Sequence, residues 1–386
     1  MVGRLWREGN PRTARPSTQP GSIGRTKFGV TIEANMERQG RGDGGTERRR
    51  GSLPRLCSAI LALCCCAGLG CLPIQQFQAK QHIRTGDALL ERENLRAALV
   101  EFQEAAKTAP QLAVAHSRLG LVYRKLGEFE AAIGSFVEAV RRDPASFDDT
   151  LNLAQLYHLT EHLREAIQAY LRAVELRPGN FDAQLDLGVC YQRSGDYQQA
   201  VQRFEKAIEI DDKRPHAFVN LGVALDAQQK YYEAVAAYRD ALERDGHQPQ
   251  VLVNLAHTYM NQDRLKMARS ALQQAIEMDP NLAAAHEALG YCLFRSREFG
   301  PAERAYQQAL TCDARLPRAH SGIGSIYMLR YLEDQDRPEF RDRALEHWHR
   351  SLESNPDQPR IRKLIAEYKP ADDDPEAVLL TRSGPR

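Results

Sequence analysis

Residues 181–214 read FDAQLDLGVCYQRSGDYQQAVQRFEKAIEIDDKR, and this stretch decides the fold. Small residues stand at Gly188, Ala200 and Ala207 within it, and a large one stands at Phe204. Residues of matching size return at these positions every 34 residues along the chain. A period of this length is typical of arrays of stacked units, because one such unit is too small to bury its own apolar face. The chain is therefore predicted to be an array of repeats.

Four ladders of residues share this period. The first alanine ladder is Ala98, Ala132, Ala166, Ala200, Ala234, Ala268 and Ala302. The second is Ala105, Ala139, Ala173, Ala207, Ala241, Ala275 and Ala309. The large residues between them are Phe102, Phe136, Tyr170, Phe204, Tyr238, Leu272 and Tyr306. Upstream, the small residues are Gly86, Gly120, Ala154, Gly188, Gly222, Ala256, Gly290 and Gly324. Small residues let neighbouring helices approach closely, and the large residue fills the remaining space.

The Leu-Gly-x-x-Tyr, Ala-x-x-x-Phe and closing Pro pattern resembles the tetratricopeptide repeat, a pair of helices joined by a turn. The resemblance covers residues 79–356. It implies an all-α fold, an α-solenoid superhelix of about eight helix–turn–helix repeats. In this frame the repeats begin at Ala79, Ala113, Phe147, Phe181, Pro215, Pro249, Ala283 and Pro317.

The end of the array departs from the period. Ala344 follows Ala302 by 42 residues, so about eight residues are inserted near residues 330–338. We expect a lengthened surface turn there, either as a plain loop or as a contact for a partner. Apolar residues at helical spacing predict a capping helix over residues 357–370. The remaining residues, 371–386, are predicted to be disordered.

The first part of the chain has a different composition. Residues 1–50 are rich in Arg, Gly, Pro and Thr, and are predicted to be disordered or to precede a true start at Met36. Residues 51–74 are mostly apolar behind a basic segment, as in a secretory signal. The pair Gly70-Cys71 resembles the cleavage site of a bacterial lipoprotein, which implies lipid attachment at Cys71. An uncleaved or ordinary signal, and no export at all, remain alternatives.

The charges and motifs limit the functions that the chain can have. The formal net charge is +1, but residues 1–55 hold 12 Arg and Lys against 5 Asp and Glu, so the rest is mildly acidic. An acidic body argues against nucleic acid as a partner. The sequence contains no glycine-rich phosphate loop, nucleophile elbow or metalloprotease motif. His158 and His162 are spaced like metal ligands but lack a third, so we interpret them as surface residues. We expect no catalysis, no cofactor and no metal.

A polar ladder lies at the sixth place of the central repeats. In this family the first helix of each repeat lines the concave face of the superhelix. The ladder resembles the asparagines in the superhelix of O-linked N-acetylglucosamine transferases, whose amides hold the main chain of a peptide. Asp186 interrupts the ladder, because a carboxylate only accepts hydrogen bonds. The peptide-binding residues implied are Asn152, Asp186, Asn220 and Asn254, beside an apolar stripe of Leu185, Val189, Val219 and Val223.

These observations predict a protein–protein interaction scaffold that binds extended peptides or partner helices on its concave face. We expect it to be tethered to the membrane outside the cytoplasm, on the periplasmic face. One alternative is a structural assembly factor of an envelope machine, such as a pilus or a secretion channel. The other is a cytoplasmic tetratricopeptide-repeat regulator.

Overall fold

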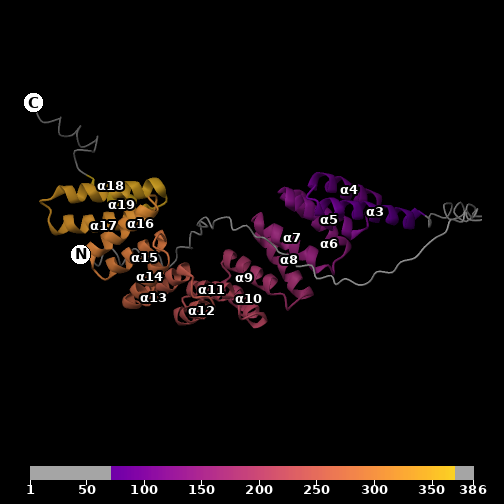
Figure 1. Cartoon of the computed structure of the whole chain (residues 1–386). Helices are drawn as coiled ribbons and strands as arrows, with labels where there is room; N and C mark the ends of the chain where they lie inside the picture. Colours follow the sequence, from indigo (N-terminus) through magenta and orange to yellow (C-terminus); the bar gives the residue numbers. More distant parts are fainter. Residues whose placement is uncertain (1–70, 370–386) are drawn as a thin grey trace, which may run out of the picture. The chain divides into compact units, whose positions relative to one another are not determined.

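The computed structural model describes residues 71–369, with the backbone alone for residues 71–73. Every regular element in this part of the chain is an α-helix, and the helices stack in sequence order (Figure 1). The helices are α3 (Cys71–Glu91), α4 (Leu95–Thr108), α5 (Ala113–Leu126), α6 (Phe129–Arg142), α7 (Phe147–Leu159), α8 (Leu163–Leu176), α9 (Phe181–Ser194), α10 (Tyr197–Ile210), α11 (Pro215–Ala227), α12 (Tyr231–Arg244), α13 (Pro249–Asn261), α14 (Leu265–Met278), α15 (Ala283–Arg295), α16 (Phe299–Cys312), α17 (Pro317–Glu333), α18 (Pro338–Ser354) and α19 (Pro359–Tyr368). The predicted all-α solenoid with a C-terminal capping helix is confirmed.

Each odd-numbered helix from α5 to α17 packs on the following even-numbered helix to form a hairpin, and each hairpin packs on the next. All seven of these first helices begin at the residue where the sequence pattern begins a repeat. The first repeat differs, because α3 begins at Cys71, eight residues before Ala79. Helix α19 closes the last hairpin through the buried side chain of Ile361.

The ladders are explained by close packing inside each hairpin. Ala200, Phe204 and Ala207 have no exposed surface, and they share a core cluster with residues of the next three repeats. A Cβ atom placed on Gly188 would lie 2.5 Å from the ring of Phe204. Glycine at this place therefore lets the first helix of a repeat rest directly on the aromatic ring of the second. The same contact recurs between Gly120 and Phe136, at 2.6 Å.

The turn inside each hairpin before α17 uses one left-handed residue. In two repeats it is a glycine, Gly127 with φ +79° or Gly195 with φ +84°. In the others the same place has a side chain and a φ near +60°, which costs roughly 1–2 kcal/mol for a residue with a Cβ. These residues are Glu93, Glu161, Gln229, Asp263 and Arg297.

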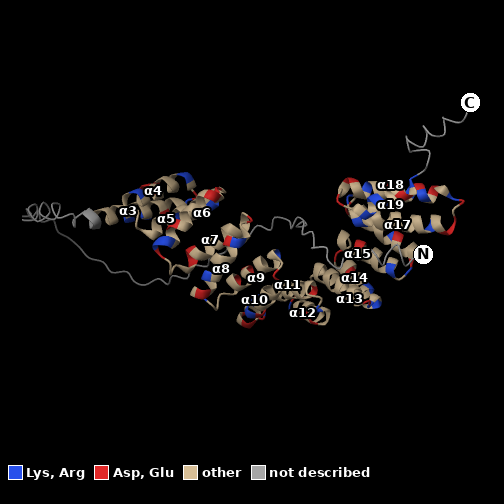
Figure 2. Ribbon diagram, turned by 180° about the vertical axis from the view of Figure 1, so that it is seen from behind, with Lys and Arg blue, Asp and Glu red and all other residues tan. Residues whose placement is uncertain are grey.

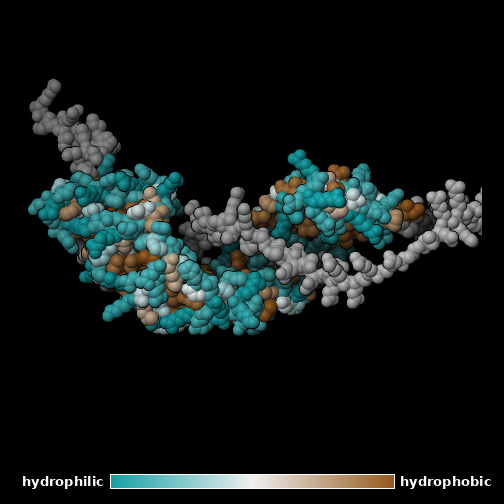
Figure 3. Space-filling view, viewed as in Figure 1, coloured by the Kyte–Doolittle hydropathy of each residue, from teal (hydrophilic) through white to brown (hydrophobic). Residues whose placement is uncertain are grey.

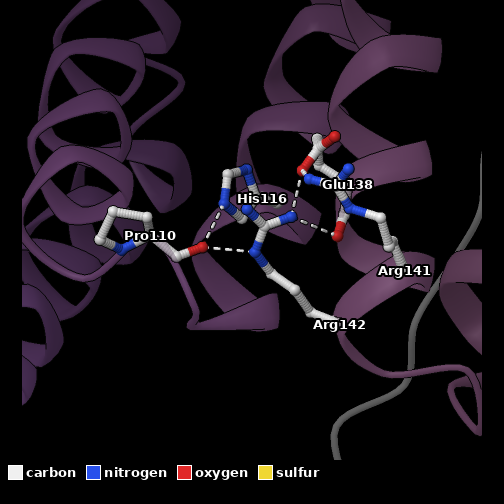
Figure 4. Close-up of polar contacts among 5 residues, drawn as sticks. All are labelled: Pro110, His116, Glu138, Arg141 and Arg142. Carbon is white, nitrogen blue, oxygen red and sulfur yellow. Dashed lines mark hydrogen bonds and ion pairs between the residues drawn. The ribbon is translucent and has the colours of Figure 1, made fainter.

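A second set of contacts fastens one repeat to the next. His116 Nε2 lies 3.0 Å from the carbonyl oxygen of Pro110, six residues earlier, and Arg142 donates to the same oxygen (Figure 4). Glu138 accepts from Arg142, which holds the guanidinium in place. Burial lowers the pKa of His116, although the bond to Pro110 opposes this shift. The equivalent contacts are Gln184 to Pro178 at 3.2 Å, His286 to Pro280 at 2.9 Å and His320 to Ala314 at 3.2 Å.

The insertion in the last repeat does not form the long surface turn that we expected. Helices α17 and α18 each have 17 residues, whereas the first and second helices of the other hairpins from α5 onward have 13 or 14. The turn between them, residues 334–337, remains short. The extra residues continue both helices because Leu329 and Tyr327 stay buried and Tyr327 stacks on Phe340.

The surface of the helices mixes charges and apolar residues. Basic and acidic residues are interspersed along the helices (Figure 2). On the face shown in Figure 3, hydrophilic residues dominate and hydrophobic residues form separate patches. Phe77 and Tyr232 are the most exposed large apolar side chains in the described range, at 62% and 77%.

Candidate functional site

The first helices of the central repeats share one accessible face. Counting from the first residue of each helix, the residues at places two, six, nine and thirteen are exposed or half-buried, while most of those between them are buried. This spacing follows one side of an α-helix. We call this surface the first-helix face. In α7, α9, α11 and α13 it consists of Asp148, Asn152, Gln155 and Leu159; Asp182, Asp186, Val189 and Arg193; His216, Asn220, Val223 and Ala227; and Gln250, Asn254, His257 and Asn261.

The first-helix face is continuous from repeat to repeat. Helix α11 contacts both α9 and α13, and α15 contacts both α13 and α17. No comparable contact joins two second helices within the described residues. The repeats are therefore closest together on the side of the first helices, which is the inner side of the stack.

The three ladder asparagines lie on this face but differ in their hydrogen bonds. The Oδ1 of Asn152 accepts from Arg124 at 2.6 Å, and its Nδ2 donates to the carbonyl of Asp148 at 2.8 Å. Asn220 and Asn254 are half-buried, and their amides make no hydrogen bond to another described residue. Two of the three amides are thus available to a ligand.

Asp186 occupies the same place in α9. Its Oδ2 accepts a 3.2 Å hydrogen bond from the hydroxyl of Tyr170. Burial raises the pKa of this carboxyl to about 6, and the nearby charge of Asp182 adds to the shift. The bond from Tyr170 and the charge of Arg214 oppose the rise. The ladder is therefore interrupted by a carboxylate that is poorly solvated.

The predicted apolar stripe is only partly on the surface. Val189 and Val223 belong to the first-helix face and are half-buried. Val219 is also half-buried and packs against the core. Leu185 is 9% exposed and lies inside the core cluster. Val189, Val219 and Val223 can contact a ligand, whereas Leu185 supports the helices beneath it.

Several polar groups near this face carried no signal in the sequence. The Oε1 of Gln192 and the Oδ1 of Asp226 are buried without a hydrogen bond. Burial raises the pKa of Asp226, although Thr258 and Asn261 lie close enough to oppose the rise. The sequence does not reveal Gln192 and Asp226 as buried polar residues, because their burial depends on the neighbouring repeat.

The same face carries a second set of charges in the later repeats. Burial lowers the pKa of His257 to about 4, with a smaller effect from Arg318. Burial also raises the pKa of Glu287, whose carboxylate lies 3.7 Å from Arg318. His257 is therefore a neutral imidazole at pH 7, and the charges here are one carboxylate and one guanidinium.

The histidines and cysteines considered as ligands or nucleophiles have other contacts. His158 packs edge-on against Tyr170, with 6.4 Å between ring centroids, and His162 Nδ1 lies 2.8 Å from the hydroxyl of Thr160. Cys190 is fully buried, and burial raises the pKa of its thiol to about 12. Cys292 is also buried. Within residues 71–369 no three His, Cys, Asp or Glu side chains are grouped as a metal site would require.

The predicted lipid attachment falls at the edge of the described range. Helix α3 begins at Cys71, and the apolar run before it lies outside the described residues. No helix of the described part is both long and apolar enough to cross a bilayer.

Two family models match the sequence. The model of the Cilia and flagella-associated protein 70 C-terminal domain matches residues 150–322. The model of the tetratricopeptide repeat matches residues 83–147 and 117–181. No curated protein matches the chain.

Solved structures of repeat proteins are similar to this chain. The C-terminal part of a TPR repeat-containing protein from Cytophaga hutchinsonii is 21% identical, with a TM-score of 0.53, and the match covers 62% of this chain and 99% of that one. The MamA protein is 25% identical, with a TM-score of 0.42, over 44% of this chain and 92% of that one. YrrB, described as a TPR protein with an unusual peptide-binding site, is 20% identical, with a TM-score of 0.45, over 48% and 96%. The first of these supports the helical-hairpin fold.

Proposed function

Because this chain is built of tetratricopeptide repeats, we propose that it is a scaffold that binds an extended segment of a partner protein along its first-helix face. The fold itself is typical of protein–protein interaction. The observation that carries the proposal is the pair of unengaged amides of Asn220 and Asn254, at equivalent places of neighbouring repeats. One asparagine amide can donate to a carbonyl and accept from an N–H, which are the two groups that a peptide main chain offers.

The three asparagines of the ladder have different roles in this proposal. Asn220 and Asn254 bind the partner directly, whereas Asn152 holds Arg124 and the end of its own helix. Half-buried amides that hold a main chain lose about 1–3 kcal/mol of binding per site when they are removed, because the partner's groups are left unpaired. The valines beside them supply apolar contact that does not depend on the partner's sequence.

A random-peptide library displayed on phage tests the proposal. Wild-type protein should enrich a set of peptides, and the double variant Asn220→Ala/Asn254→Ala should bind every enriched peptide at least tenfold more weakly. Circular dichroism should be unchanged, because neither amide supports the fold. Asn152→Ala and Glu205→Lys, the latter on an exposed site of a second helix, should retain binding. Equal binding by the double variant and wild type would contradict the proposal and move the site to another surface.

We also propose that the scaffold is tethered to a membrane outside the cytoplasm through Cys71. The support comes from the sequence, where Gly70-Cys71 follows an apolar run behind arginines. The Cys71→Ala variant of the full chain should move from the membrane pellet to the soluble fraction after a high-salt wash. Continued pelleting would point to a different anchor, and wild-type protein in the cytosolic fraction would support the regulator alternative.

A further inference from the structure

Asp186 is an acidic group on the first-helix face that lacks a basic partner. Its carboxylate is half-buried, and its hydrogen bond comes from the neutral hydroxyl of Tyr170. The arginines of the surrounding repeats are engaged with other groups. They bind as follows: Arg124 to Asn152, Arg177 to Asp148, Arg193 to Glu161 and Arg214 to Asp182.

One oxygen of this carboxylate remains open to a ligand. Oδ2 accepts from Tyr170, but Oδ1 makes no hydrogen bond to the described residues. Oδ1 has no partner among them and is not a fully buried atom, so it reaches the surface. An exposed carboxylate oxygen without a partner can accept a hydrogen bond from a ligand, and a charged donor gives a stronger bond than a neutral one.

The neighbouring residues suit a long side chain with a charged end. Val189 lies one helical turn from Asp186 on the same face of α9, and Val223 has the equivalent place in α11. Both are half-buried and pack against the core. Lysine and arginine characteristically lay their methylene stems on apolar surface and extend the charged end to a polar group.

The other repeats supply an internal comparison. An amide stands at the same place in α7, α11 and α13, as Asn152, Asn220 and Asn254. An amide is cheaper to half-bury than a carboxylate, because the ionised form loses more solvation. The extra cost of Asp186 is offset when a cation takes the place of the lost water.

We propose that Asp186 forms a subsite for a lysine or arginine side chain of the bound peptide, with Val189 and Val223 contacting its methylene stem. This inference rests on the proposed function, since the same peptide main chain is held by Asn220 and Asn254. Asp186 therefore determines which peptides bind, whereas the asparagines hold any peptide.

The subsite has a pH dependence of defined sign. The charged and titratable groups around Asp186 are Tyr170 of α8, Asp182 and Cys190 of its own helix, and Arg214 before α11. The pKa of the empty carboxyl is about 6, and a bound cation lowers it. Peptide affinity should therefore be constant above about pH 7 and should fall below pH 6, towards about tenfold per pH unit.

The random-peptide phage library, panned on wild-type protein and on Asp186→Asn, tests this inference. Peptides enriched by wild type should share a Lys or Arg at one position. In a synthetic copy, replacing that residue by norleucine should weaken binding to wild type at least tenfold at pH 7.5. The same replacement should change binding to Asp186→Asn by less than twofold. Glu205→Gln removes an exposed carboxylate from the second helix α10, away from the first-helix face, and should keep the wild-type preference.

The outcomes separate this inference from the proposed function. The inference would be overturned by enriched peptides without a shared basic residue, or by a basic preference that persists in Asp186→Asn. The scaffold proposal would still be upheld in either case if Asn220→Ala/Asn254→Ala lost binding. No enrichment by wild type would overturn both. Asp186→Asn keeps the shape of the side chain, so circular dichroism matching wild type ensures that any lost preference arises at the subsite.

Discussion

The hydroxyl of Tyr170 donates a 3.2 Å hydrogen bond to Asp186 in the next repeat. The ring of Tyr170 is fully buried, so a core residue of one repeat ends at the accessible face of its neighbour. Tyr306 of α16 likewise reaches the sixth place of the next first helix, α17. A Cβ on Gly322, which occupies that place, would lie 2.5 Å from the ring of Tyr306. In these two pairs the large residue of one repeat thus influences which side chain can occupy the sixth place of the next.

Asp186→Asn should stabilise the empty protein at neutral pH. The folded pKa of about 6 is above the ordinary value of about 3.9, so folding favours the protonated carboxyl. The stability that wild type gains from protonation is complete below pH 3.9 and is lost as pH rises through 6. Thermal unfolding followed by circular dichroism should show a higher midpoint for the variant at pH 7.5. The difference should close towards pH 4, and a constant difference would contradict the assigned burial.

Gly188→Ala should destabilise the solenoid by about 1–3 kcal/mol, because the new methyl group would overlap the buried ring of Phe204. Gly134→Ala is the matched control. No atom lies within 4 Å of a Cβ at Gly134, which is inside α6. Alanine there should therefore stabilise by about 0.5–1 kcal/mol. Urea unfolding of both variants measures the difference, and equal effects would mean that the glycine ladder is not a packing contact.

Gln229→Gly should stabilise the protein by up to about 1 kcal/mol, since Gln229 has a φ of +63° and an exposed side chain. Gly195→Ala should destabilise it by a similar amount at the equivalent turn, where φ is +84°. The two midpoints of urea unfolding should move in opposite directions. Movement in the same direction would show that side-chain contacts, and not the backbone angle, determine the stability of these turns.

The register of the repeats could be predicted from the sequence because it depends on residue size. Glycine and alanine recur where Gly188 and Ala200 lie against Phe204, and only small residues fit there. The fold class followed from the same ladders. The left-handed turn residue was missed because side chains of four different types occupy it, and glycine marks it only at Gly127 and Gly195.

The state of each candidate site residue could not be predicted. Asn152 and Asn220 are the same residue at the same place, but only Asn152 has Arg124 in reach, from the preceding repeat. Leu185 and Val189 look alike in the sequence, yet Leu185 lies in the core. The insertion near residues 330–338 was expected to lengthen a loop, because the length of an insertion does not reveal whether it continues a helix. These differences depend on contacts between repeats.

Acid should weaken the last hairpin through His320 and His347, whose Nδ1 atoms are 3.1 Å apart. His320 donates from Nε2 to Ala314, so its Nδ1 accepts from His347. Burial lowers the pKa of both rings, and each ring also lies near the charges of Glu346 and Arg350.

The stability from this neutral pair is complete above about pH 6.5 and is lost as pH falls below it. His347→Gln should therefore lose less stability than wild type between pH 7.5 and 5. Urea unfolding at both pH values, with hydrogen exchange of α17 and α18, measures the loss. Parallel losses in the two proteins would exclude the histidine pair as the source, and the charges of Glu303 and Glu353 would then be examined by substitution.

The contacts that stabilise this chain join residues that are close to each other in the sequence. The hydrogen bond from Arg295 to Met260 spans 35 residues, and each hairpin packs chiefly on its neighbours. A force applied to the two ends would therefore detach one hairpin at a time and leave the others intact. Each detached unit of about 34 residues would release roughly 110–120 Å of extended chain. A scaffold fixed at one end could in this way lengthen under load in discrete steps while its remaining repeats still held their partner.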